Sequence, residues 1–427
     1  MRRYFYLLAS LCLASPGVSE QAANPDAARL QPLMELVGQT RNARVEGDIA
    51  SWLAAGQQAL ALTPDHPDML ISVARASAAA GERQQALADL QQAVRRGAGL
   101  EPDRFPEFKS LETDPVFQTI ASAAKRNEAA VANATEFARL PGREAEGIAY
   151  DPVSKQLFAG SEGELLAIDR YGKVTTFISG GGLRQLLGIK VDAKRRLVWL
   201  VTGRFPNPPG GAPSTQPDVG TSGIRAYNID TRALIASYEL DERPLFHGFN
   251  DLALANDGTV YVTDSSTGSV YKVAPRAKSL ELLVRDARMS FPNGIALSND
   301  QKTLYVACVE GIYAVDPRTG EHKLMPVPEN VSVNSIDGLL IYKGALIGVQ
   351  ASPYLHRLVR IRLAPDSQSI EGATVLTSRT PAQYNQTTAA IGDGHIYMVG
   401  GTPVTDVYTG RPLAEPIRAI WRVPLGK

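Results

Sequence analysis

Two stretches of the 427-residue chain, NDLALANDGTVYVT at 250–263 and GIALSNDQKTLYVA at 294–307, share one pattern: an apolar strand, a polar turn and a second strand. β-Branched and aromatic residues alternate within them, as in short antiparallel strands. Further copies of the unit occur between residue 133 and the C-terminus. Their first strands read GIAYD from Gly147, GIKVD from Gly188, DLALA from Asp251, GIALS from Gly294, GLLIY from Gly338 and TAAIG from Thr388.

Each unit continues with more short strands, so the pattern predicts a mainly β fold, a six-bladed β-propeller over residues 133–427. The sixth unit ends one strand short, after AIWRVPL near the C-terminus. We expect ATEFARL at 134–140 to supply the missing strand. A blade shared by both ends of the domain would close the ring without a free edge.

Residues 27–130 are instead rich in Ala, Leu, Gln and Arg at helical spacing. An offset of 34 residues pairs Gly47 with Gly81 and Ala59 with Ala93. This period resembles the tetratricopeptide repeat, a helical hairpin with a turn glycine. Such a segment either offers a groove to a protein partner or packs as a cap on the propeller. Fewer than three repeats seldom stand alone, which favours the cap.

The N-terminus begins with MRR, continues with the apolar run YFYLLASLCLA and ends at Val18 and Ser19. This pattern predicts a signal peptide over residues 1–19, and so a periplasmic or secreted protein. The run is short for a bilayer, so no stable membrane span is expected, although an uncleaved anchor is the alternative. After cleavage only Cys308 remains, and a formal net charge of zero gives no reason to expect nucleic acid as a partner.

The residue just before each inner strand lies at one mouth of the propeller channel, so six such positions form a ring. They are Glu146, Leu187, Asn250, Asn293, Asp337 and Thr387. Four of the six carry carboxylate or amide oxygens, which are the ligands that Ca²⁺ prefers. Clustered thiols or imidazoles are absent from the ring, which disfavours zinc. The alternative is that Asn and Asp occur here because they stabilise turns.

Four segments carry a family resemblance: AEGIAYD at 145–151, FNDLALANDGTVYVTD at 249–264, FPNGIALSNDQKTLYVA at 291–307 and SIDGLLIYKGALIGV at 335–349. They resemble the metal-bearing motifs of the senescence-marker/gluconolactonase family and of the related paraoxonase-type lactonases. The resemblance implies a divalent cation, commonly Ca²⁺, on Glu146, Asn250, Asn293 and Asp337. It also implies lactone or ester hydrolysis, with the ion polarising the carbonyl and Asp337 assisting attack by water.

Two histidines are further candidates. His247, three residues before Asn250, is a candidate general base, and His356, in the loop ASPYLHR, is a candidate substrate-binding residue together with Asn250. The family's arginine two residues before the second motif's Asn is replaced by Gly248, so sugar lactones are not specifically expected.

The leading hypothesis is an exported calcium-dependent hydrolase acting on a small-molecule lactone or ester. The alternative is a non-catalytic scaffold with at most a structural metal, whose helical segment recruits a protein partner.

Overall fold

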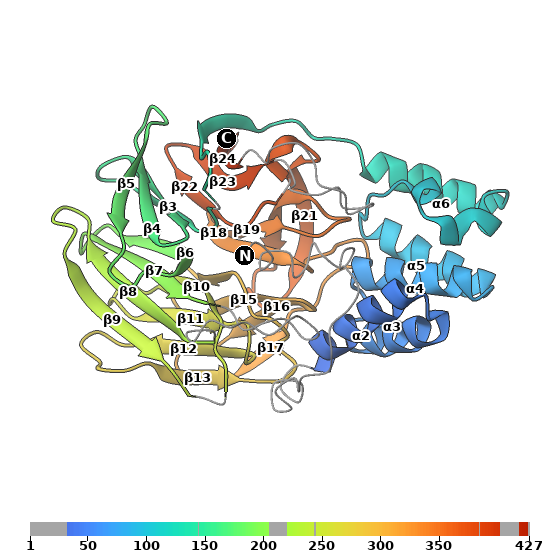
Figure 1. The fold of residues 1–427 in the computed structure, drawn as a ribbon, viewed down its shortest axis with the longest axis horizontal. Coiled ribbons are helices and arrows are strands. Elements are labelled where there is room, and N and C mark those ends of the chain that lie inside the picture. The colour runs from blue at the N-terminus through green and yellow to red at the C-terminus, as the bar shows by residue number, and fades with distance from the viewer. Residues whose placement is uncertain are drawn as a thin grey trace.

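The computed structural model describes residues 32–425 apart from 144, 205–219, 243–244, 384 and 402–417, so the predicted signal peptide at 1–19 lies outside the described residues. The chain forms a helical unit, residues 32–127, followed by a β-propeller (Figure 1). No helix in the described part is long and apolar enough to cross a membrane. The domain limits 27–130 and 133–427 stay predictions.

The helical unit begins with two hairpins related by the 34-residue offset. Its elements are α2 (Pro32–Glu46), α3 (Ile49–Leu62), α4 (Pro67–Ala79), α5 (Arg83–Arg95), η2 (Pro102–Arg104), η3 (Pro106–Leu111) and α6 (Pro115–Asn127). Gly47 and Gly81 have φ values of 76° and 83° at the two hairpin turns, a conformation that costs glycine little. Ala59 and Ala93 are fully buried, as small residues between closely packed helices should be.

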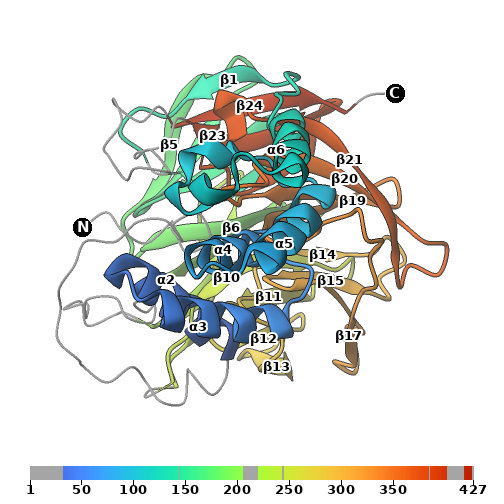
Figure 2. The ribbon, with the colours of Figure 1, turned by 90° about the vertical axis from the view of Figure 1, so that its right-hand side faces the viewer.

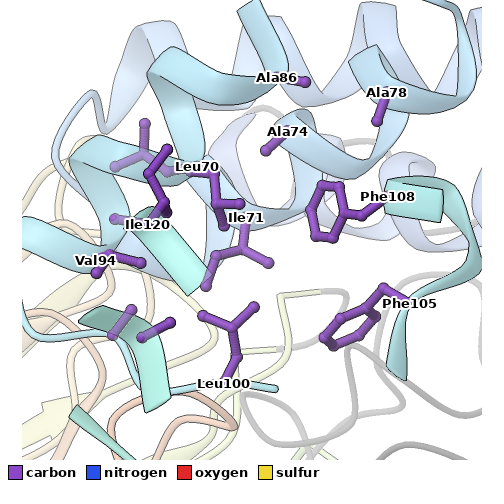
Figure 3. Close-up of a cluster of buried hydrophobic side chains, with 14 of the residues drawn as sticks. Leu70, Ile71, Ala74, Ala78, Ala86, Val94, Leu100, Phe105, Phe108 and Ile120 are labelled. Carbon is purple, nitrogen blue, oxygen red and sulfur yellow. The ribbon is translucent and has the colours of Figure 1, made fainter. Parts of the chain in front are cut away.

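A hydrophobic core holds these helices together (Figure 3). Leu70 and Ile71 of α4 pack with Val94 of α5 and with Phe108 of η3. The same cluster includes Tyr354, which belongs to a loop of the propeller. The helical unit and the propeller therefore share one hydrophobic core at this point.

Six antiparallel sheets of four strands form the blades, which confirms the predicted six-bladed propeller. From the channel outward, the strands are β2 (Ile148–Asp151), β3 (Gln156–Ser161), β4 (Glu164–Ile168) and β5 (Val174–Ser179); β6 (Gln185–Asp192), β7 (Leu197–Gly203), β8 (Ser222–Asn228) and β9 (Leu234–Leu240); β10 (Phe249–Leu254), β11 (Val260–Asp264), β12 (Ser269–Val273) and β13 (Glu281–Arg285); β14 (Ile295–Leu297), β15 (Leu304–Cys308), β16 (Gly311–Val315) and β17 (His322–Leu324); β18 (Ile336–Tyr342), β19 (Ala345–Gln350), β20 (Arg357–Leu363) and β21 (Ile370–Ser378); and β22 (Ala389–Gly392), β23 (His395–Gly401), β24 (Arg418–Pro424) and β1 (Thr135–Arg139).

The last blade is completed as the sequence predicted. β1, which lies within ATEFARL, pairs antiparallel with β24, so both ends of the propeller share one sheet. A short helix, η4 (Pro381–Gln383), lies between β21 and β22. The ring therefore closes through backbone hydrogen bonds, and no strand edge between the first and last blades is left open.

The helical unit lies over one face of the propeller, as both views show (Figures 1 and 2). This is the face where the inner strands begin, because the loops that touch the helices precede β18 or follow β19. Asp68 Oδ1 accepts a hydrogen bond from Ser352 Oγ at 2.8 Å, and Arg96 Nη1 donates to Val331 O at 2.9 Å. Met69 of α4 packs in a second apolar cluster with Val309. The helices thus form a cap on the propeller.

The buried Asp68 makes this junction sensitive to pH. Burial raises the pKa of Asp68 to about 7, although the Ser352 hydrogen bond and Arg379 act in the opposite direction. The folded protein therefore holds this proton more tightly than the unfolded chain. The resulting stability is complete below about pH 4, the carboxyl's ordinary range, and is lost as the pH rises through about 7.

We expect Asp68→Asn to raise the melting temperature relative to wild type more at pH 8 than at pH 5, because an amide accepts the Ser352 bond without a buried charge. The difference should correspond to about 2 kcal/mol, since each pKa unit is worth about 1.4 kcal/mol. Thermal unfolding at both pH values measures it. The exposed cap residue Asp48, whose pKa is lowered mainly by its Ser51 hydrogen bond, gives the control Asp48→Asn. An equal shift at both pH values for Asp68→Asn would contradict the prediction.

Candidate metal centre

The inner strands crowd around the propeller axis. β2, β6, β10, β14, β18 and β22 each contact the next, and β22 contacts β2. A Cβ on Gly147 would lie 1.6 Å from Leu187 O, and one on Gly294 would lie 2.5 Å from Leu339 N. Only glycine fits such an approach of two backbones, which explains why glycine follows Glu146 and Asn293 in the sequence.

The predicted ligands occupy irregular positions of the inner strands. The strand register shifts between residues 249 and 252 and between residues 336 and 339. Asn250 and Asp337 lie inside these two bulges. A bulge re-aims a side chain that would otherwise pack on one face of the sheet, and bulges are common beside active sites. The irregularity therefore frees both side chains from packing between blades.

Glu146, Asn293 and Asp337 come together at this mouth. The Asn293 amide is hydrogen-bonded to the Asp337 carboxylate, whose charge in turn acts on Glu146. One oxygen of each side chain, Glu146 Oε2, Asn293 Oδ1 and Asp337 Oδ1, is buried without a hydrogen-bond partner. A buried oxygen without a partner is costly, and three together require an explanation. One divalent cation would satisfy all three.

Asn250, the fourth predicted ligand, is oriented by a serine. Ser265 Oγ lies 2.6 Å from Pro292 O, a carbonyl that can only accept, so the serine donates its hydrogen there. Ser265 must then accept the hydrogen bond from Asn250 Nδ2, at 3.0 Å. The amide nitrogen of Asn250 is thereby used, and its oxygen is the atom that it can offer to a cation.

The electrostatics of the cluster also favour a bound cation. Burial and the Asp337 charge raise the pKa of Glu146 well above its ordinary value, against the influence of Arg418. Burial, with the charge of Asp251, raises the pKa of Asp337 to about 7, although the Asn293 hydrogen bond acts in the opposite direction. Two adjacent buried carboxylates cannot both ionise easily unless a positive charge lies beside them.

The other two ring positions do not extend this set. Leu187 is buried and apolar. The hydroxyls of Thr387 and Thr388 donate to Glu146 O at 2.9 and 2.7 Å, which fixes the backbone at the first ligand. Among the described residues no three His, Cys, Asp or Glu side chains gather as a metal-ligand group, so a cation at this site would depend on the amides as well as on the two carboxylates.

Three charged residues near the ring were not predicted from the sequence. Asp251, which is 1% exposed, accepts from Lys190 Nζ at 2.7 Å. Arg418 Nε donates to Ala145 O at 2.8 Å, directly before Glu146. Asp251 could have been noticed, because it stands where four of the other repeats have glycine. Nothing in the local sequence indicates the place of Arg418, which comes from the last strand of the chain.

The structure does not bring the two candidate histidines into this cluster. His247 is fully buried, with Nδ1 2.6 Å from Asp264 Oδ2 and Nε2 3.4 Å from Glu242 Oε2. His356 lies at the predicted mouth but is buried, and burial together with Arg379 lowers its pKa to about 3. The roles predicted for His247 in catalysis and for His356 in substrate binding stay predictions.

Comparison with known families bears on part of the chain. Residues 219–315 match the model of the SMP-30/Gluconolactonase/LRE-like region. This stretch is SMP-30/gluconolactonase-like. The match contains Asn250 and Asn293, whereas Glu146 and Asp337 lie outside it. No curated protein sequence matches the chain as a relative.

Several solved structures resemble the chain at low sequence identity. A gluconolactonase from Xanthomonas campestris is 18% identical, with 66% of this chain and 86% of that chain covered and a TM-score of 0.45. The calcium-binding protein regucalcin from Agrobacterium tumefaciens is 17% identical, with 65% and 89% covered and a TM-score of 0.45. A chain of a nidogen/laminin complex is 14% identical, with 60% and 87% covered and a TM-score of 0.46. At these identities the likeness says nothing about activity.

If the cluster binds Ca²⁺, binding must displace protons from Glu146 and Asp337, whose pKa values are raised in the folded protein. We therefore expect the affinity for Ca²⁺ to fall as the pH is lowered through about 7, where Asp337 takes up its proton. Calorimetry at pH 6 and pH 8, in buffers of different ionisation enthalpy, measures both the affinity and the protons released. An affinity independent of pH over this range, without proton release, would contradict this assignment.

Proposed function

We propose that the protein is a hydrolase of a small lactone or ester that depends on a divalent cation, most simply Ca²⁺, held by Glu146, Asn250, Asn293 and Asp337. The observation that carries the proposal is the set of three buried, unpartnered oxygens from Glu146, Asn293 and Asp337. The SMP-30/gluconolactonase-like match over residues 219–315 supports the same reaction class. A bound divalent cation supplies a Lewis acid that polarises a carbonyl oxygen.

The side chains of the cluster have separate roles in the proposed reaction. Asp337 is assigned the role of taking a proton from an attacking water, because carboxylates serve as general bases and this one lies within the cluster. Asn293 donates to this carboxylate and so holds its direction. Asn250 is held by Ser265, so its amide oxygen can contact either the cation or a hydrogen-bond donor of the substrate. Burial of the cluster limits access of bulk water to these charges.

The substrate is expected to be small. Gly248 leaves no side chain at the position where gluconolactonases place an arginine, so the sequence offers no particular recognition of a sugar lactone. Export to the periplasm or medium is part of the proposal and is supported by the residues 1–19, with their basic start and short apolar run. A panel of aliphatic, homoserine, sugar and aromatic lactones with aryl esters is the appropriate screen.

Asp337→Asn separates binding from proton transfer. It keeps an oxygen at the site but removes the base, so we expect kcat/KM on the best panel substrate to fall by about 10²–10⁴-fold. Asp337→Ala and Glu146→Ala each remove a charged ligand and should abolish tight Ca²⁺ binding as well. Kinetics with added Ca²⁺ or EDTA, together with calorimetry, distinguish these effects.

The matched control is Glu281→Ala. Glu281 is a largely exposed carboxylate, 70% accessible, on the outer strand β13, so its loss should leave both readings unchanged. If wild type binds Ca²⁺ but turns over no member of the panel above background, the enzyme proposal gives way to a binding scaffold with a structural metal. If Glu146→Ala and Asp337→Ala both bind Ca²⁺ like wild type, the ligand set is wrong.

Asn293 provides a graded test of the neutral ligand. Asn293→Asp keeps an oxygen and adds charge, so Ca²⁺ binding should survive while hydrolysis falls, because added negative charge weakens the Lewis acid. Asn293→Leu has similar bulk but no oxygen and should lose both. Equal activity in the two variants would argue against Asn293 as a ligand.

A further inference from the structure

The loop that leads to Asp337 is held by the helical unit at both of its ends. At its start, Arg96 Nη1 donates to Val331 O at 2.9 Å. At its end, His66 Nε2 lies 3.2 Å from Ser335 Oγ, and both residues are buried. Ser335 is followed by Ile336, the first residue of β18, and then by Asp337. His66, which is distant in sequence, therefore contacts the chain two residues before the proposed ligand Asp337.

Ser335 has an unusual backbone conformation. Its φ is 55°, in the left-handed region that residues with a Cβ adopt only at a cost. Such outliers persist where the surroundings fix them, and they cluster at functional sites. Ser335 O also accepts from Ala351 N at 2.9 Å, so the backbone is held on one side and the side chain on the other.

The tautomer of His66 follows from its contacts. His66 is the N-cap of α4, and its Nδ1 accepts from Asp68 N–H at 3.2 Å. Burial lowers the pKa of His66 to about 4, so the ring is neutral at ordinary pH. A neutral ring whose Nδ1 accepts carries its proton on Nε2, which therefore donates to Ser335 Oγ. One imidazole thus caps the helix and holds the loop.

The same end of α4 also fixes the neighbouring strand. Asp68 accepts from Ser352 Oγ, just after β19, while β18 and β19 pair through Ile336 and Gln350. Gln350 Nε2 donates to Ser332 O at 3.1 Å and to Asn334 O at 2.9 Å. The start of β18 and the end of β19 are therefore both bonded to one helix terminus.

We propose that the helical unit is a positioning element of the metal centre: His66 holds Ser335 in its left-handed conformation and thereby sets the direction of the Asp337 carboxylate. The proposal rests on the metal centre proposed above. It makes His66 and Ser335 positioning residues, because neither is placed among the ligands. It also means that the helical unit is built into the propeller mouth and is not a detachable adaptor.

Two substitutions of His66 separate its two hydrogen bonds. Asn presents its acceptor near the place of Nδ1 and is a good N-cap, but it is too short to reach Ser335. Gln can place a donor near Nε2 but is a poor cap. In the full chain we expect His66→Asn to weaken Ca²⁺ binding about tenfold, the lower end of the range for residues that support a metal ligand. We expect His66→Gln to lower the melting temperature in EDTA while keeping Ca²⁺ affinity close to wild type.

Substitutions of Ser335 leave the helical unit intact and serve if a His66 variant does not fold. Ser335→Ala and Ser335→Gly both lose the bond from His66, but only alanine keeps a Cβ in the left-handed region. Ser335→Ala should weaken Ca²⁺ binding, whereas Ser335→Gly should bind nearly as wild type does. Adding Ser335→Gly to His66→Asn should restore most of the lost affinity.

Calorimetric titration with CaCl₂, paired with thermal unfolding in EDTA, gives both readings without any assay of activity. If His66→Asn and Ser335→Ala bind Ca²⁺ as wild type does, with at most a change in melting temperature, the contact only stabilises the fold and the positioning role is overturned. If wild type itself binds no Ca²⁺, the metal centre fails and the positioning role fails with it. The two failures are thus distinguishable.

Discussion

The close approach of six inner strands around one axis is the constraint on which the rest of the structure depends. A Cβ on Gly147 would lie only 1.6 Å from Leu187 O, so there is no room for a side chain where these two inner strands meet. The residue before such a glycine is turned toward the mouth, and bulges do the same at Asn250 and Asp337. Closure of the ring by β1 and β24 fixes this crowding, because no blade can then move outward independently.

Crowding also explains the unusual electrostatics. Carboxylates from different inner strands come together in one desolvated region. Burial raises the pKa values of both Glu146 and Asp337, and the charge of Asp337 adds to the effect on Glu146, as that of Asp251 does on Asp337. The fold compensates partly with cations of its own, through Lys190 beside Asp251 and Arg418 beside the first ligand. A divalent cation would satisfy the remaining unpartnered oxygens, and this is the physical basis of the proposed function.

The helical unit forms part of the propeller mouth. It shares a hydrophobic core with the propeller through Tyr354 and places buried polar groups, His66 and Asp68, against the loops that flank β18 and β19. Each buried polar group needs its own hydrogen-bond partner, so these contacts allow only one arrangement of the two units. The helical unit is therefore joined to the element that carries Asp337.

The sequence by itself determined the number of blades, the closing strand and the four candidate ligands. These follow from local rules: strand alternation, the repeated turn, and the equivalent positions of Glu146, Asn250, Asn293 and Asp337 in their repeats. It also predicted the paired helical hairpins from a 34-residue offset. Local rules are enough here because each blade is built mainly from contacts between consecutive strands.

Only the tertiary structure decided what surrounds those ligands. The burial of His247 against Asp264 and the contact of His66 with Ser335 depend on residues 17 and 269 positions apart in sequence. The raised pKa of Asp337 depends on burial and on Asp251 from another blade, and the place of Arg418 depends on how the last blade meets the first. No local sequence pattern predicts these contacts, because the distances, the desolvation and the interactions between charges arise only when the ring closes.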